Sequence, residues 1–300
     1  MDKAVAASSI SIIGNGNHEI EKSTMNLNDL VNSKVPNVAH IENASNGLGA
    51  EDGVRVCGIH EYKQAAQSLA EAFAEDDVAM YFIDTPDREH WTKEQKWNLH
   101  TQILEYVTYA HVMKGLVLTA GEDYGCVALW MPPGHNMDDL YTIFRSGMWR
   151  LYFQLSSEGK KRFFTEFLPL LHDAKARTLG DRDHDSWYLV YLGAKKAARG
   201  QGLAKKVVEK VTKMADAQSK ACYLESSNDK NPAIYMRWGF ELARKVVLQR
   251  GPENIELDIM IREPNPKTVE AKNGQGKTKK AWMNEGIQVT TDPEDNRLPC

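Results

Sequence analysis

The stretch GAKKAARGQGLAKKVVEKV, residues 193–211, follows a long apolar run and carries two closely spaced glycines after its first lysines. From Lys195 to Lys213 the chain has seven basic residues and one acidic residue, Glu209. Three interpretations fit this pattern: a basic helix for nucleic acid, a solvated lysine face, or a turn that holds phosphate. The choice among them bears directly on the fold.

The lysines are explained by helical geometry. In a helix that begins near Gly200 and advances 100° per residue, the apolar side chains fall on one arc of roughly 140° and the charged ones on the opposite arc. Long cationic side chains commonly cover such a solvated face. The whole chain has 37 basic and 41 acidic residues, a net charge of −4, whereas nucleic-acid binders more often carry a positive excess. We therefore expect no nucleic-acid partner. The apolar arc consists of Leu203, Ala204, Val207, Val208, Val211, Met214 and Ala215.

The glycines indicate a different role for the turn itself. Gly200 and Gly202 lie where an apolar strand pattern changes into a helix. The first turn of a helix has free N–H groups and a partial positive charge, and glycine lets the backbone approach an anion closely. The dipole contributes only about 0.3–1 kcal/mol, so several hydrogen bonds to a charged group, about 1.5–3 kcal/mol each, would dominate. The turn predicts a pyrophosphate site; a plain tight turn is the alternative.

The composition divides the chain into a core and two tails. Residues 1–53 contain no aromatic residue and are rich in Asn, Ser, Ala and Gly, and Trp282 is the one aromatic residue of 264–300. Such segments bury too little apolar surface to offset the entropy of ordering them. We expect a disordered tail over 1–53, a folded domain over 54–263 and a loosely ordered tail over 264–300. No apolar run approaches the roughly 18 residues of a membrane span, so we expect a cytoplasmic protein with no membrane partner.

The core alternates between strand and helix patterns, which favours a mixed α/β domain with a central sheet. Its second and third strand patterns flank the turn GEDYG and predict a hairpin. The run SWYLVYLG is nearly all apolar, as expected of a buried central strand. The strand patterns are residues 54–59, 115–120, 124–131, 186–193, 221–226, 240–248 and 255–261; the helical patterns are 61–74, 92–113, parts of 136–178, the segment after 200, and 233–237.

The turn Arg199–Ala204, RGQGLA, matches the Gln/Arg-x-x-Gly-x-Gly/Ala motif, and on these residues the chain resembles the GNAT acyl-CoA N-acetyltransferases. WYLVYLGA resembles the central strand of that family, and YLESSNDKNPAIYMRWGFE resembles the segment that closes its site. Together with ALWMPPG, these segments are most similar to the puromycin N-acetyltransferase-like branch, including its fungal members. The resemblance is strong over residues 186–245 and weaker over 54–185.

The resemblance implies a GNAT fold, α/β (α+β), with a mixed, partly parallel central sheet that is splayed at the acetyl-CoA site and has helices on both faces. Acetyl-CoA would be the co-substrate, with no metal. Lys196 departs from the proline that many members have there. The implied cofactor-binding residues are Leu192, Gly193 and Ala194 for the pantetheine arm, Arg199, Gly200, Gln201, Gly202, Leu203 and Ala204 for the pyrophosphate, and Asn231.

Two residues are candidates for proton transfer. The resemblance implies that Tyr235 protonates the leaving thiolate, a step that suits a phenol with a pKa near 10. Glu225 is the candidate base, because a charged residue is unusual in an apolar strand such as CYLES. A structural carboxylate at Glu225, or a water activated by His184 or Asp185, remains open as an alternative.

The predicted function is transfer of acetyl from acetyl-CoA to a primary amine of a small molecule, by direct attack in a ternary complex. Trp130, Trp187 and nearby tyrosines are candidates for an acceptor pocket or, alternatively, for packing. One alternative function is a protein or peptide N-acetyltransferase, which predicts an open acidic groove across the splayed strands. The other is a non-catalytic acyl-CoA-binding regulatory module.

Overall fold

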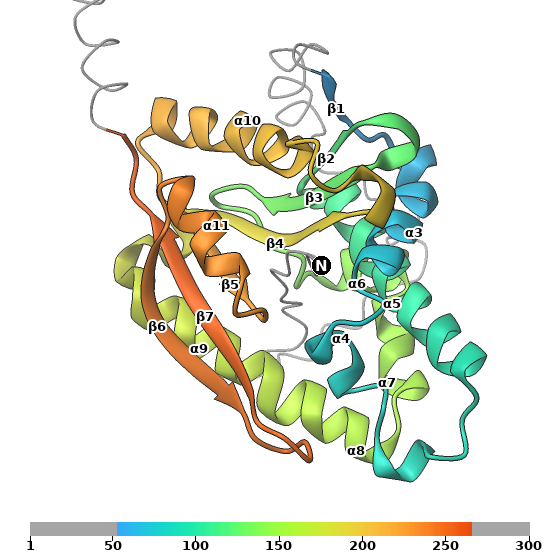
Figure 1. Cartoon of the computed structure of the whole chain (residues 1–300). Helices are drawn as coiled ribbons and strands as arrows, with labels where there is room; N and C mark the ends of the chain where they lie inside the picture. The colour runs from blue at the N-terminus through green and yellow to red at the C-terminus, as the bar shows by residue number, and fades with distance from the viewer. Residues whose placement is uncertain (1–52, 266–300) are drawn as a thin grey trace, which may run out of the picture. The chain divides into compact units, whose positions relative to one another are not determined.

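A seven-stranded sheet runs through residues 53–265, the part of the chain that the computed structural model describes (Figure 1). Its strand order is β1-β2-β3-β4-β5-β7-β6, and the pairs are antiparallel except β4 and β5, which are parallel. The two predicted tails lie outside the described residues, except for their innermost positions. The strands are β1 Val54–Val56, β2 Leu116–Ala120, β3 Cys126–Met131, β4 Trp187–Ala194, β5 Cys222–Ser226, β6 Glu241–Leu248 and β7 Ile255–Arg262.

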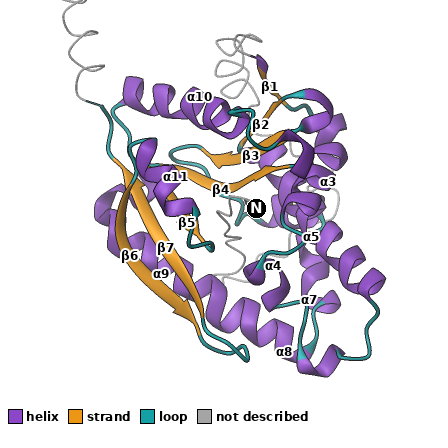
Figure 2. Ribbon diagram, viewed as in Figure 1, coloured by secondary structure: helices purple, strands orange, loops and turns teal. Residues whose placement is uncertain are grey.

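Helices cover both faces of the sheet (Figure 2). On one face lie α3 (Tyr62–Ala72), α5 (Lys93–Lys114) and α9 (Leu168–Leu179), and on the other α10 (Leu203–Gln218) and α11 (Asn231–Arg237). No helix of residues 53–265 is both long and apolar enough to cross a membrane. Shorter helices complete the chain: α4 Asp77–Tyr81, α6 Leu140–Ser146, α7 Leu151–Gln154, α8 Ser157–Lys160, a π-helix Lys161–Phe167, and 3₁₀ turns that include Gly180–Asp185 and Lys196–Ala198.

Local sequence signals explain where the longest helix begins and ends. The Thr92 hydroxyl accepts a hydrogen bond from the Gln95 N–H at 3.2 Å, and the Gln95 side chain accepts one from the Thr92 N–H at 2.8 Å. This reciprocal capping box fixes the start of α5. The helix ends before Gly115, where a Cβ would lie 2.5 Å from the Trp130 carbonyl oxygen. Only glycine lets β2 begin so close to β3.

The predicted two faces of α10 are confirmed. Leu203, Val207, Val208, Val211 and Ala215 are buried against the sheet, as the apolar arc requires. The lysines of the opposite arc point away from this core: Lys205, Lys206 and Lys213 are exposed, and Lys205 forms an ion pair with Glu209 at 3.4 Å.

The sheet splits between its two parallel strands. The ladder from β4 to β5 joins only Trp187–Leu189 to Cys222–Leu224. Beyond this point β4 continues to Ala194, paired with β3 alone among the described strands. β4 also contains a bulge, because Tyr191 lies opposite Leu129 and Leu189 opposite Trp130, so that Val190 has no counterpart. The predicted splay is therefore confirmed, and the bulge lies at its apex.

Candidate active site

The backbone N–H groups of the glycine turn, from Gly200 to Ala204, donate no hydrogen bond to another described residue. Gly200 has a φ of +79° and Gly202 a φ of +73°, the left-handed region that glycine adopts without strain. Gly202 is the N-cap of α10, and no side chain caps the helix there. A Cβ built on either glycine would meet no atom within 4 Å. The space beside the two glycines is therefore open, and the N–H groups at the start of α10 have no acceptor within residues 53–265, an arrangement suited to an anion.

Two side chains of the turn hold it from within. The Arg199 Nε donates to the Ala194 carbonyl at 3.2 Å, and the Gln201 amide nitrogen donates to the Ala197 carbonyl at 3.2 Å. Arg199 is half-buried and Gln201 exposed. Both side chains therefore help to fix the conformation that aims the glycine N–H groups outward.

The free edge of β4 continues from the turn into the split. Leu192, Gly193 and Ala194 pair with β3, and no β5 residue pairs with them. A Cβ on Gly193 would lie 2.8 Å from the Cβ of Ala72, so this glycine is also needed for close packing of α3 on β4. A small cavity of about 30 Å³ lies between the end of α3, the turn before α10 and the loop after β5; its lining includes the acidic residues Glu71, Glu75, Asp76 and Asp77 as well as Lys196, Arg199, Ser227 and Asn228. Beyond the ladder with β5, this edge of β4 therefore has no second strand partner among the described residues, although Leu192 is 0% exposed and Gly193 is buried.

Tyr235 and Asn231 lie on α11, whose start follows the β5 loop. Asn231 is buried as the first residue of the helix. Tyr235 is 0% exposed, packs edge-on against Trp238 and Phe240, and its hydroxyl has no hydrogen-bond partner among the described residues. Burial raises the pKa of Tyr235 well above its ordinary value, with a smaller effect from Cys126. The phenol is held protonated, and a buried hydroxyl without a partner is an unfavourable arrangement that a ligand atom would relieve.

Glu225 lies at the apex of the split, one residue beyond the β4–β5 ladder. Its side chain is buried, and its Oε2 accepts a hydrogen bond of 2.7 Å from the Tyr188 hydroxyl, while Oε1 has no partner among the described residues. Burial raises the pKa of Glu225 to about 8, although Tyr188, Tyr223 and the Lys175 ammonium counteract the shift. This carboxyl group titrates in the range where a general base is useful.

A cavity of about 430 Å³ lies beside the bulge, on the α9 face of the sheet. Its floor includes Tyr188 and Val190 of β4. The rest comes from the loop after β3, from α9 and from the 3₁₀ turn Gly180–Asp185, and the polar members are His135, Asn136, Asp138, His172, Asp173, Lys175, Asp183, His184 and Ser186. Within residues 53–265 no group of three or more His, Cys, Asp or Glu side chains is arranged to hold a metal ion. Burial and the neighbouring Asp139 raise the pKa of Asp138 to about 6, although His184 opposes this.

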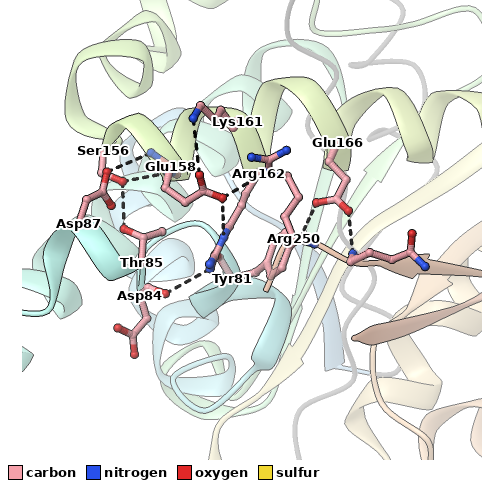
Figure 3. A network of polar contacts seen from close by, with 12 residues as sticks. Tyr81, Asp84, Thr85, Asp87, Ser156, Glu158, Lys161, Arg162, Glu166 and Arg250 are labelled. Carbon is pink, nitrogen blue, oxygen red and sulfur yellow. Dashed lines mark hydrogen bonds and ion pairs between the residues drawn. The ribbon is translucent and has the colours of Figure 1, made fainter. Parts of the chain in front are cut away.

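A second, open groove of about 1050 Å³ lies between α4, the β5 loop and the turn that joins β6 to β7. Figure 3 shows the polar network along one wall of it: the Tyr81 hydroxyl donates to Glu166, and the Arg250 N–H donates to the Tyr81 hydroxyl at 2.8 Å. Arg162, buried below, donates to the Tyr81 carbonyl at 2.7 Å. These contacts fix the β6–β7 turn against α4 and the π-helix. The acidic residues of the groove are Glu75, Asp77, Asp84, Asp229, Glu253 and Glu256.

The remaining candidates divide between the cavity and the core. His184 is exposed and lines the cavity, whereas Asp185 forms an ion pair with Lys220. Trp130 and Trp187 are buried in the core on the α10 face and contact each other edge-on, so they pack and do not line the cavity. Sequence reasoning missed Tyr188 as the partner of Glu225. The available signal was a tyrosine in β4, a strand expected next to the one that carries a buried acidic residue.

Comparisons with known proteins agree with this architecture. The profile of the acetyltransferase (GNAT) family matches residues 165–240. An uncharacterised N-acetyltransferase of Schizosaccharomyces pombe is 42% identical over 230 residues, which cover 77% of this chain and 90% of that protein. This fungal relative fits the fungal type expected from the sequence.

Two solved structures are also similar. Arylalkylamine N-acetyltransferase 2 of Aedes aegypti has a TM-score of 0.48 at 17% identity, covering 71% of this chain and 98% of that one. A histone acetyltransferase-related protein of Corynebacterium glutamicum has a TM-score of 0.44 at 20% identity, covering 71% and 96%. With the identity and coverage of the yeast relative, the family profile and the splayed sheet, the chain belongs to the acetyltransferase (GNAT) family and is an acetyl-CoA-dependent N-acetyltransferase.

Proposed function

We propose that this protein transfers acetyl from acetyl-CoA to a primary amine of a small molecule by direct attack in a ternary complex. The observation that carries the proposal is the split between β4 and β5, which connects a glycine turn with free N–H groups to an apex where Val190 and Tyr188 border a cavity of about 430 Å³. Residues 54–263 form the catalytic domain in this proposal, and the cytoplasmic location stays a prediction.

The cofactor would lie along the free edge of β4. Its pyrophosphate accepts hydrogen bonds from the N–H groups of Gly200 to Ala204, where nothing else occupies the space around the two glycines. Its pantetheine arm pairs with Leu192 to Ala194 as an added strand, and Asn231 closes the site from α11. The thioester then lies near the bulge, within reach of both strands.

The chemistry needs one proton acceptor and one proton donor. The amine attacks the thioester carbonyl as a neutral nucleophile, a C–N bond forms, and the C–S bond breaks. Glu225 takes up the proton of the amine, and its raised pKa makes it a stronger base than an exposed carboxylate. Tyr235 gives its proton to the departing thiolate. Each transfer would contribute about 10²–10⁴ in rate.

Two features favour a small acceptor. The cavity beside Tyr188 has a volume typical of small-molecule sites, about 300–1,000 Å³, and is lined by both apolar and polar groups. The open acidic groove supports a second candidate, a basic peptide as acceptor. Three of the groove's acidic residues already form ion pairs with lysines, which weakens its attraction for a cationic chain: Glu75 with Lys196, Asp84 with Lys96 and Glu256 with Lys245.

A thiol-release assay tests the proposal. The full chain is mixed with acetyl-CoA and, in turn, with arylalkylamines, polyamines, aminoacyl nucleosides and basic peptides, and free thiol is measured. We expect turnover with one class of small amine. Turnover with peptides alone would indicate that the acceptor is a peptide bound in the open groove. Tight acetyl-CoA binding without turnover on any acceptor would contradict the proposed function and favour the non-catalytic alternative.

A further inference from the structure

The Glu225 side chain does not line the cavity beside the bulge, whereas the Tyr188 side chain does. Glu225 is 2% exposed and is absent from the cavity lining, whereas Tyr188 is partly accessible and forms part of that lining. The Tyr188 hydroxyl donates to Glu225 at 2.7 Å. A single phenol therefore separates the buried carboxylate from any molecule bound in the cavity.

We propose that the acceptor amine binds in the cavity beside the bulge and that Tyr188 relays its proton to Glu225. This inference rests on the proposed function, and adds to it a residue that transfers the proton and the side from which the amine approaches the thioester. In the step, the amine nitrogen forms a bond to the thioester carbon while its N–H proton passes to the Tyr188 oxygen. The Tyr188 proton moves at the same time to Glu225 Oε2, so the phenol ends as it began and the carboxylate becomes a carboxylic acid.

The surroundings of Tyr188 fit a concerted relay. Burial first, and the Glu225 charge second, raise the pKa of Tyr188 well above its ordinary value, so a free phenolate is disfavoured. A phenol that gains one proton as it loses another never carries that charge. The charged and titratable groups that act on the pair are Lys175 of α9, whose ammonium lies 5.6 Å from the Tyr188 ring, Tyr191 of β4 and Tyr223 of β5; Asp183 of the 3₁₀ turn and Arg244 of β6 act on Tyr223.

Other cavity groups are less suited to the role. Lys175 donates to the Asp183 carbonyl at 2.5 Å and forms an ion pair with the Asp183 carboxylate, so its ammonium is a fixed cation that cannot accept a proton. Asp138 belongs to the loop after β3 and His184 to the 3₁₀ turn, so neither lies on a strand that borders the split. Tyr188 lines the cavity and joins it to the apex of the split through its hydrogen bond to Glu225.

Three variants and a double variant of the full chain test the relay: Tyr188→Phe, Glu225→Gln, their combination, and Tyr223→Phe as the matched control. Tyr223 is a fully buried tyrosine in edge contact with Tyr188; its hydroxyl lowers the pKa of Glu225 but, unlike that of Tyr188, forms no well-aligned hydrogen bond with a described residue. With the amine found in the screen, kcat and KM are measured from pH 6 to 10, and acetyl-CoA affinity and thermal midpoint are measured alongside.

The wild-type kcat is expected to rise with pH, with its midpoint near pH 8, and then to level off. Tyr188→Phe lowers kcat about 10²–10³-fold at pH 7.5, keeps acetyl-CoA affinity, and shifts the rise toward the amine's own pKa. Glu225→Gln gives the same shift toward higher pH, and the double variant is no slower than either single one, because the two groups act as a unit. Tyr223→Phe stays within a few-fold of wild type.

Three results would overturn the relay while leaving the proposed function intact: an unchanged pH profile in Tyr188→Phe, losses that multiply in the double variant, or an equal loss in Tyr223→Phe. Should Tyr188→Phe lower the thermal midpoint strongly, Glu225→Asp provides the second measurement. Shortening the carboxylate lengthens the contact with Tyr188 without removing either group, so kcat must again fall and the pH profile must shift. Failure of wild type to acetylate any amine would instead contradict the proposed function itself.

Discussion

Replacing Gly202 by valine separates cofactor binding from backbone strain. Gly202 begins α10 with a φ of +73°, and a Cβ there would point into open space. In the proposed complex the pyrophosphate occupies that space. The Cβ of a valine would therefore enter the ligand's space without meeting a protein atom within 4 Å.

The expected loss has two parts. Holding a non-glycine residue in the left-handed region costs roughly 1–2 kcal/mol of folding stability. Losing two hydrogen bonds from the turn to a charged phosphate costs about 3–6 kcal/mol of binding, at about 1.5–3 kcal/mol each. Since about 1.4 kcal/mol corresponds to a factor of ten, the dissociation constant for acetyl-CoA should rise about 10²–10⁴-fold.

Calorimetric titration with acetyl-CoA and thermal unfolding measure the two parts separately. Gly134→Val is the matched control, because Gly134 has a φ of +76°, equally open surroundings, and a place on the loop between β3 and α6. Both variants should lose stability, and only Gly202→Val should lose affinity.

Unchanged acetyl-CoA affinity in Gly202→Val, with the loss of stability present, would refute the assignment of the pyrophosphate to this turn. An equal loss of affinity in Gly134→Val would show that strain alone weakens binding. Either outcome removes the main support for the proposed cofactor position.

Three further outcomes are expected. Tyr235→Phe should lower turnover about 10²-fold or more with little change in acetyl-CoA affinity by calorimetry, and equal losses of both would assign Tyr235 to packing. The folded-state pKa of Glu225 is raised, so wild type loses unfolding free energy as pH rises from about 4.5 to about 8. Glu225→Gln does not ionise, so its unfolding free energy relative to wild type should be higher at pH 9 than at pH 5. The same difference at both pH values in urea titrations would contradict this. Arg262 and Asp216 form a nearly buried bidentate pair at 2.7 and 2.8 Å, so Asp216→Ala should lower the unfolding free energy in urea by about 3–5 kcal/mol. In the exposed pair with Arg182, Glu263→Ala should lower it by at most about 1 kcal/mol.

The sequence was sufficient for the features that depend on neighbouring residues. All seven strands and the apolar face of α10 follow from local periodicity, and the turn at Gly200 to Gly202 follows from its glycines. The first strand is shorter than predicted, ending at Val56, because the chain turns at Gly58 into a 3₁₀ turn whose Glu61 carboxylate accepts the Gly58 N–H at 2.8 Å.

The features that remained hidden depend on register between distant segments. The bulge at Val190 exists only in relation to β3, about 60 residues earlier in the chain. The contact of Tyr188 with Glu225 joins residues 37 positions apart, and each looked ordinary in its own strand. Which side chains border the cavity depends on α9, whose placement no local pattern specifies.

The three-residue parallel ladder between β4 and β5 also bears on how the protein folds. The strands before it, β1 to β4, form an antiparallel series, and β5, β7 and β6 form another, so each group can assemble from its own pairings. Joining the groups requires one short contact between segments separated by the whole of α10, which is slow to form because chain entropy is lost before the contact is made. Glu225 and Tyr188 meet only after that joining. Recovery of activity during refolding should therefore report the last step of assembly, later than the recovery of strand and helix signals.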